Sequence, residues 1–283
     1  MNGFEIAGGT VMGKDHRVIS LGNQDAYWWF VSDKMIVAVV CDGCGSAPHS
    51  EVGAKIGARL VVESVRKILD LYDSIDPDAM MERVRRDVLA QLRTLALNMG
   101  QSLTQTVSDL FLFTVMGFAL TSRGVITFSV GDGFHSFNGK VFREGPFPGN
   151  APPYLAYGGL IDSSLDVSES AMFKFKTDFM FPLEIVESVL IASDGLEDLI
   201  AAADNNLPGK KEKVGSLKQF WENGLFFENP DSIRRRLFQI NREVIRPDWG
   251  NQCLEKETGW LADDATLVVA RRQIGKEASW KSA

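Results

Sequence analysis

Aspartates lie at the ends of several apolar segments that have the length and composition of buried strands. Asp42 follows such a segment in "VAVVCDG", Asp132 in "ITFSVGDG" and Asp194 in "SVLIASDGLED". Asp263 and Asp264 come immediately before another in "LADDATLVVA". In an antiparallel sheet the end of one strand lies beside the beginning of its neighbour. These acids can therefore converge at one edge of the core although they are far apart in sequence.

A group of carboxylates at close range favours a divalent cation. Each negative charge raises the pKa of the others, and a hard cation such as Mg²⁺ or Mn²⁺ removes that repulsion. Glycine after Asp42 and Asp194 permits a tight turn and lets a backbone carbonyl approach an ion. A single Asp-Gly pair is more often only a turn that ends a strand. Because four such segments occur in one chain, the cation site is the better interpretation.

Cys41 and Cys44 have the C-x-x-C spacing of a zinc or redox pair. Zinc needs further ligands, and the chain offers only Cys253 and three histidines, none of which forms a second close pair. A thioredoxin-like pair opens a helix directly after a strand, whereas a glycine-rich turn follows here. Buried or incidental thiols are therefore the favoured interpretation.

Composition excludes some classes of protein. The chain has 283 residues, 45% of them hydrophobic, and a formal net charge of -7. That charge argues against general binding to nucleic acid, since a phosphate backbone attracts basic surfaces. No secretory signal and no apolar run of membrane-spanning length is visible, so no membrane partner is expected. Three cysteines are too few for a disulfide framework, and a reducing, cytoplasmic location is expected.

Amphipathic helices and short apolar strands must position these residues. Ser50 is expected to cap a long helix, and a second is expected after Asp76-Pro77, where proline suits the first helical position. The two helices would pack as an antiparallel pair over a sheet. Strands are expected at Met35–Cys41, Phe111–Leu120, Val125–Val130, His135–Phe142, Glu187–Ser193 and Ala265–Ala270. This antiparallel-rich pattern with helices inserted in blocks predicts an α+β fold.

The chain is expected to form a single catalytic domain over about 1–275, with a tail at 276–283. A region rich in proline and glycine predicts a flap-like excursion at about 145–180. A helical insertion is expected at about 201–261, with one helix whose apolar stripe reaches Ile245.

Five motifs, taken in order, resemble those of the metal-dependent protein phosphatases, the protein phosphatase 2C family. "NQDA" resembles the N-E-D motif, with Gln24 in the glutamate position. "VVCDGCGS" resembles D-G-x-G, "VGDG" resembles G-D-S/G, "SDGLED" resembles S-D-G-L-x-D, and "DDATLVV" resembles D-N-x-T. The motifs run from Asn23 to Val269, and the first two look most like a divergent bacterial branch.

The resemblance implies two stacked antiparallel sheets flanked by helices, an α-β-β-α sandwich with a metal site at one end. Asp42 would bridge two metal ions, and the Gly43 carbonyl would bind one of them. Asp194 and Asp263 would complete the binuclear site, while Asp25 would hold a water bound to the metals. These four aspartates are the expected catalytic group, with two Mg²⁺ or Mn²⁺ ions as cofactors.

The resemblance also implies a weaker third metal site, formed by Asp132 and Asp198 together with Asp194. Many members of the family carry an arginine shortly before N-E-D that grips phosphate. Arg17 lies in that region at a longer spacing, and His16 is its rival for phosphate binding.

Two further departures from the family concern the centre itself. Cys44 stands where eukaryotic relatives have a histidine that can act as general acid, so protonation of the leaving group would fall to water. Asp264 replaces the usual asparagine and adds a negative charge beside the metals.

The function that the resemblance implies is a metal-dependent phosphatase acting on phosphoserine or phosphothreonine in proteins. A water activated by two cations would attack phosphorus in line, without a phosphoenzyme. Its partners would be a phosphorylated protein substrate and a cognate serine/threonine kinase. The alternative is a catalytically impaired, phosphatase-like module that binds phosphorylated partners without turning them over.

Overall fold

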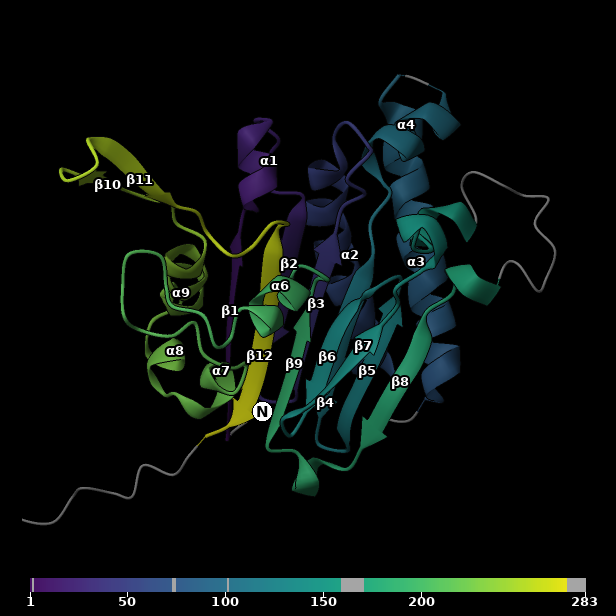
Figure 1. The fold of residues 1–283 in the computed structure, drawn as a ribbon. Coiled ribbons are helices and arrows are strands. Elements are labelled where there is room, and N and C mark those ends of the chain that lie inside the picture. Colours follow the sequence, from purple (N-terminus) through teal and green to yellow (C-terminus); the bar gives the residue numbers. More distant parts are fainter. Residues whose placement is uncertain (2, 73–74, 101, 159–170, 274–283) are drawn as a thin grey trace, which may run out of the picture.

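Two antiparallel sheets of five strands each lie face to face in the computed structural model, which describes residues 1, 3–72, 75–100, 102–158 and 171–273. Helices cover the outer face of each sheet, which gives the four layers visible in Figure 1. This arrangement confirms the predicted α+β sandwich. None of the helices in these ranges has both the length and the apolar character that crossing a bilayer requires.

The first sheet is built around a strand that is buried on both faces. Along β3, Val37, Val39 and Cys41 pack toward the covering helices, whereas Ile36 and Val40 point toward the other sheet. This alternation follows from the two-residue period of a strand. The order of this sheet is β2 (Asp25–Val31), β3 (Met35–Asp42), β4 (Val115–Thr121), β5 (Gly124–Val130) and β8 (Lys176–Phe181).

The second sheet repeats this design around β12. Leu267 and Val269 face the helices on their side, and Val268 and Ala270 face the first sheet. The two sheets therefore share one apolar layer, while each also has a core beneath its own helices. The order of this sheet is β1 (Phe4–Val11), β12 (Ala265–Arg272), β9 (Ser188–Ala192), β6 (Gly133–Phe137) and β7 (Lys140–Glu144).

Helices α2 and α3 pack against the first sheet, and α8 and α9 pack against β1 of the second. Asp76 caps α3 as predicted, because its carboxylate accepts a hydrogen bond from the Ala79 N–H at 3.0 Å. The predicted Ser50 cap is wrong: Ser50 is the first residue of α2, and its hydroxyl instead donates to the Cys44 carbonyl oxygen at 2.9 Å. The helices are α1 (Lys14–Val18), α2 (Ser50–Leu71), α3 (Pro77–Asn98), α4 (Leu103–Leu110), α6 (Leu196–Ala201), α7 (Gln219–Glu222), α8 (Leu225–Glu228) and α9 (Ser232–Ile240).

Several strand predictions need correction. The strand expected at Phe111–Leu120 begins only at Val115, because Phe111 ends α4. The strand expected at His135–Phe142 is the hairpin of β6 and β7, in which Asn138 and Gly139 adopt the positive φ angles that a tight Asn-Gly turn requires. Strands β1, β2 and β8 were not predicted.

The expected flap and insertion contain more strand than the sequence suggested. Residues 159–170 lie outside the described residues, and the last part of the segment 145–180 belongs to β8. The insertion 201–261 holds α7, α8 and α9 together with a hairpin of β10 (Val244–Asp248) and β11 (Cys253–Glu257). Ile245 lies in that hairpin and is 54% exposed, so its assignment to a helical stripe was wrong. The tail 276–283 is outside the described residues, and the domain boundaries stay a prediction.

Candidate metal centre

Asp25 and Asp42 are brought together by the pairing of β2 with β3. Asp25 begins β2, Asp42 ends β3, and the two are opposite each other in the antiparallel register. Side chains at opposed positions lie on the same face of a sheet, with Cβ atoms about 4.5–5.5 Å apart. Strand pairing alone therefore places one carboxylate beside another at this end of the first sheet.

Asp194 and Asp263 come from the neighbouring strands β9 and β12 of the second sheet. Asp194 follows β9 by two residues, and Asp263 precedes β12. The Ser193 N–H donates to the Thr266 carbonyl oxygen at 3.0 Å, which fixes the two strand ends against each other. Gly195 is required here, because a Cβ at this position would overlap the Asp264 carbonyl oxygen.

A hydrogen bond joins the two sheets at this end. The Ser193 hydroxyl donates to Asp25 Oδ2 at 2.7 Å, and both residues are buried. Asp25 Oδ1 and Asp194 Oδ1 are also buried, and neither has a hydrogen-bond partner among the described residues. Buried carboxylate oxygens without partners are costly, so these two atoms indicate a place for a cation or for water.

The electrostatics of the group are dominated by repulsion between acids. Burial, then the negative charge of Asp264 and to a smaller extent that of Asp194, together raise the pKa of Asp25 to about 8, although the hydrogen bond from Ser193 opposes the shift. The pKa of Asp42 lies well above its usual range, chiefly through burial and then through Asp25, Asp194 and Asp263. The charged neighbours with the largest effects are thus all carboxylates. A hard divalent cation with oxygen ligands would reverse both shifts, so this donor set fits Mg²⁺ or Mn²⁺.

The backbone at Gly43 is held in place beside these acids. The Gly43 N–H donates to the Gln24 carbonyl oxygen at 3.2 Å, and a Cβ on Gly43 would lie 2.8 Å from the Ser50 hydroxyl. Gln24 itself is buried, and its side-chain amide donates to the same hydroxyl at 2.7 Å. Gln24 was noted in the sequence only as a departure from the N-E-D motif. In the structure it supports the turn that carries Gly43.

The two acids expected at a third site behave differently. Asp132 is 7% exposed, and burial followed by the charge of Asp194 raises its pKa to about 6. Asp132 therefore belongs electrostatically to the same group. The Asp198 carboxylate instead accepts a hydrogen bond from the Ala262 N–H at 2.6 Å, which orients the loop that carries Asp263.

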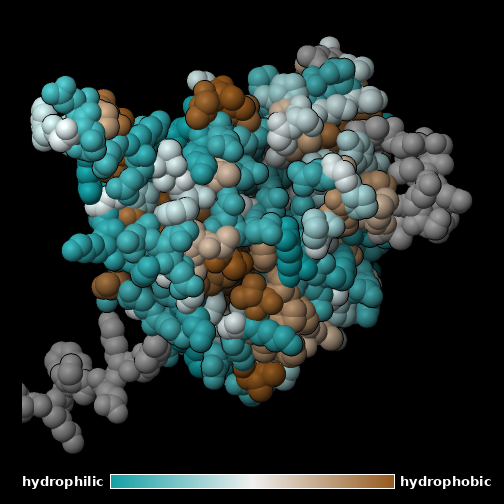
Figure 2. Space-filling model, in the orientation of Figure 1, coloured by the Kyte–Doolittle hydropathy of each residue, from teal (hydrophilic) through white to brown (hydrophobic). Residues whose placement is uncertain are grey.

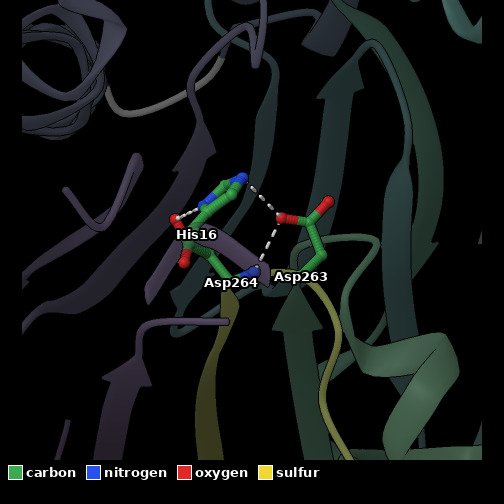
Figure 3. A group of neighbouring side chains, drawn as sticks. All are labelled: His16, Asp263 and Asp264. Carbon is green, nitrogen blue, oxygen red and sulfur yellow. Dashed lines mark hydrogen bonds and ion pairs between the residues drawn. The ribbon is translucent and has the colours of Figure 1, made fainter. Parts of the chain in front are cut away.

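His16 lies directly beside Asp263 and Asp264, as Figure 3 shows. Its Nδ1 is 3.0 Å from Asp264 Oδ2, and its Nε2 is 3.5 Å from Asp263 Oδ1. Asp264 is only 2% exposed, and its two oxygens accept hydrogen bonds from the backbone N–H groups of Gly13 and Gln24 at 2.7 Å and 2.6 Å. Asp264 thus ties the N-terminal segment to the start of β12, a role that sequence reasoning did not identify.

Arg17 points to a different neighbour. Its guanidinium donates to the Asn241 carbonyl oxygen at 2.8 Å, just beyond the end of α9. The expectation that Arg17 or His16 binds phosphate stays a prediction.

The cysteines do not form a metal site with the residues described. Cys41 is buried under α2, and burial, then the charges of Asp25 and Asp42, raise the pKa of its thiol. Cys44 is partly exposed, and all three cysteines are free. Among the described residues, two groups of three side chains have potential ligand atoms within 4.8 Å of one another, and neither contains a cysteine.

Comparison with known proteins identifies a family for most of the chain. A family model described as protein phosphatase 2C matches residues 12–238. No curated protein matches the sequence closely enough to be significant.

Solved structures of bacterial phosphatases share the fold over nearly the whole chain. The serine/threonine phosphatase Stp1 from Staphylococcus aureus is 16% identical, with 95% of each chain covered and a TM-score of 0.53. A bacterial serine phosphatase is 16% identical, with 96% of this chain and 99% of that chain covered and a TM-score of 0.52. The Mycobacterium tuberculosis phosphatase PstP/Ppp is 12% identical, with 95% and 99% covered and a TM-score of 0.51. At these identities the likeness establishes the fold.

Proposed function

We propose that this chain, which belongs to the protein phosphatase 2C family, is a metal-dependent protein phosphatase that hydrolyses phosphoserine or phosphothreonine. One observation carries the proposal: acids from four strand ends, distant in sequence, meet with raised pKa values and with buried oxygens that lack partners. These carboxylates repel one another, and a bound cation would remove that repulsion.

The residues present fit a binuclear site. Asp42, Asp194 and Asp263, together with the Gly43 carbonyl, would hold two Mg²⁺ or Mn²⁺ ions. When bound, the ions supply a lowered pKa for water and positive charge beside the phosphoryl oxygens. Asp25 Oδ1, the oxygen without a partner, would accept a hydrogen bond from the attacking water and so orient it.

Asp132 and Asp194, supported by Asp198, would form the weaker third site. Asp132 is already repelled by Asp194, so a third ion is favoured by the same electrostatics. Asp198 would join only if its carboxylate kept an oxygen free, because one oxygen accepts the Ala262 N–H. We leave the choice between Mg²⁺ and Mn²⁺ to metal titration.

Of the two candidates for phosphate binding, His16 is the better placed. It contacts Asp263, whereas Arg17 must release the Asn241 carbonyl before it can turn to a phosphate. Protonation of the leaving group would come from water, because Cys44 occupies the position where a general acid would stand.

The phosphoprotein substrate would approach the end of the sandwich that carries the acids. Helix α1 projects at this end, and Figure 2 shows an apolar group on the surface there. Val18 and Ile19, directly after His16 and Arg17 in the chain, are 83% and 69% exposed. Exposed apolar side chains beside a reaction centre suit contacts with a protein partner. A cognate serine/threonine kinase and a cytoplasmic location, which suits three free cysteines, complete the proposal.

The test is release of phosphate from a phosphoserine peptide with and without Mn²⁺. Activity is expected only with the metal, and Asp42→Ala and Asp194→Ala should each lower it by about 100-fold or more. Asp33→Ala, in the exposed turn between β2 and β3, is the matched control and should keep full activity. Unchanged turnover in both site variants would reject the proposal. Tight binding of the peptide without any turnover would favour the alternative, a binding module. The observation that supports this alternative is that the Arg17 side chain is hydrogen-bonded to the Asn241 carbonyl.

A further inference from the structure

A second group of potential ligands lies at the open edge of the sandwich and shares no residue with the acid centre. It consists of His135 on β6, Glu144 at the end of β7, and Asp178 on β8. Strands β6 and β7 are neighbours at one edge of the second sheet, and β8 is the edge strand of the first. The group therefore bridges the two sheets at an edge that no further strand covers within the described part of the chain.

Strand geometry explains how the three side chains meet. His135 pairs with Phe142 across the β6–β7 hairpin, so Glu144, two residues further, projects from the same face. On β8 the register with β5 shifts: Thr177 pairs with Phe128 and Phe179 with Thr127. Asp178 is the extra residue of this bulge, and a bulge redirects a side chain that would otherwise follow the strand.

The atoms of the three side chains are close enough to share one ion. One nitrogen of His135 and one oxygen each of Glu144 and Asp178 all lie within 4.8 Å of one another. His135 is 1% exposed, and neither of its ring nitrogens has a hydrogen-bond partner among the described residues. The rings of Phe142 and Phe179 lie 5.6 Å and 4.9 Å from the imidazole and leave its nitrogens unsatisfied. A buried imidazole with no partner, facing two carboxylates, is costly unless it binds something.

A surface lysine, Lys176, supplies the positive charge that faces the Glu144 and Asp178 carboxylates. Lys176 Nζ lies 2.8 Å from Glu144 Oε2 and 3.2 Å from Asp178 Oδ1, yet the lysine side chain is 62% exposed. Asp178 is 1% exposed at its side chain, so it depends on this partner. Burial lowers the pKa of His135 to about 4, with the charge of Glu144 opposing this shift and that of Lys176 adding to it. Lys176 can turn into solvent and leave its place to an ion.

We propose that His135, Glu144 and Asp178 form a second divalent-metal site that takes Zn²⁺ or a related first-row transition ion rather than Mg²⁺. Imidazole nitrogen with two carboxylate oxygens is a ligand set that suits Zn²⁺, whereas Mg²⁺ prefers oxygen ligands and keeps its water. The ion ties β8 to the β6–β7 hairpin and so fastens the two sheets at their open edge. The site does not depend on the proposed phosphatase activity.

The test uses a parent protein in which Asp42→Asn, Asp194→Asn and Asp263→Asn weaken the acid centre, including the group formed by His16, Asp263 and Asp264. Zn²⁺ binding is measured by equilibrium dialysis, and Co²⁺ is used as a probe because its visible absorption reports imidazole and carboxylate ligands. The parent should bind one Zn²⁺ tightly. Changing a residue that only orients a metal ligand costs about 10- to 100-fold in affinity, so loss of a ligand in Glu144→Gln or His135→Gln should cost at least about 100-fold.

Lysine variants distinguish a metal site from a simple ion pair. Lys176→Met should bind Zn²⁺ more tightly than the parent, since the competing ammonium is gone. Lys174→Met, at an exposed lysine two residues earlier, is the matched control and should leave the affinity unchanged. Glu144→Gln carries the test if His135→Gln does not fold, because the Glu144 side chain is partly exposed. The proposal is overturned if the parent binds no Zn²⁺, or if Glu144→Gln binds it as tightly as the parent.

Discussion

Replacing Asp25 with asparagine should stabilise the metal-free protein at alkaline pH. Burial and neighbouring acids raise the pKa of Asp25 from 3.8 to about 8 in the folded state. Between those two values the folded protein binds more protons than the unfolded chain, so stability is lost as the pH rises through this window. The Asp25→Asn variant has no such proton to lose.

The size of the effect follows from that pKa. One proton that separates the two states costs about 1.4 kcal/mol for each pH unit. From about pH 5 to about pH 8 the metal-free wild type should therefore lose about 3 to 4 kcal/mol relative to Asp25→Asn. A change of 1 kcal/mol moves the Tm of a chain of this size by roughly 2–4 °C, so the difference in Tm should approach about 10 °C.

The assay is thermal unfolding in a chelator over that pH range. Asp33→Asn, at the other end of the same β2–β3 hairpin and exposed, is the control and should follow the wild type. Saturating Mn²⁺ should reverse the order, since the wild type gains more stability from the ion than Asp25→Asn does. If Asp25→Asn and the wild type show the same Tm at every pH without metal, the repulsion inferred at this centre is absent.

Three further outcomes are expected. Gly195→Ala should lower the free energy of unfolding by about 1–3 kcal/mol and weaken Mn²⁺ binding, because the new Cβ collides with the backbone beneath the centre. Gly22→Ala, with open space around it, is the control and should change neither, so equal thermal stability of the two variants would contradict the packing argument. Joint replacement of Cys41 by alanine and Cys44 by serine should leave Mn²⁺-dependent hydrolysis within a few-fold of wild type. Loss of hydrolysis in this variant would show that a thiol takes part in the reaction. Calorimetry of Mn²⁺ binding near neutral pH, in two buffers of different ionisation enthalpy, should show that protons are released on binding. Asp25, with a pKa of about 8, must ionise as the metal enters, so binding with no proton exchange would contradict that pKa.

Much of the acid centre could be predicted from the sequence because its acids border strongly apolar strands. The segments that became β3, β5, β9 and β12 are buried and rich in β-branched residues, which makes them visible without a structure. The order of the motifs then sufficed for the family and the fold. The partner strand β2 was missed although Ala26–Val31 is a run of apolar and aromatic residues, which favour strands.

The supporting contacts could not be predicted, because they join residues that lie far apart in the chain. Asp264 accepts hydrogen bonds from Gly13 and Gln24, and Asn241 ends α9 where its side chain bonds Met12 and Leu261. Such contacts have no signature in local composition. Asn241 is also the residue at which the predicted helix ends, ahead of the β10–β11 hairpin.

The group around His135 was missed for a similar reason. Asp178 enters it through a bulge in a strand of exposed and half-buried residues, and no local pattern in the sequence indicates that register shift.

Anomalous diffraction from crystals soaked in Mn²⁺ tests the central claim most directly. We expect two strong peaks within coordination distance of Asp42, with Asp194 and Asp263 as further ligands and Asp25 facing the water between them. Density that shows these carboxylates hydrogen-bonded only to one another or to water, with no manganese peak at saturating metal, would contradict the account.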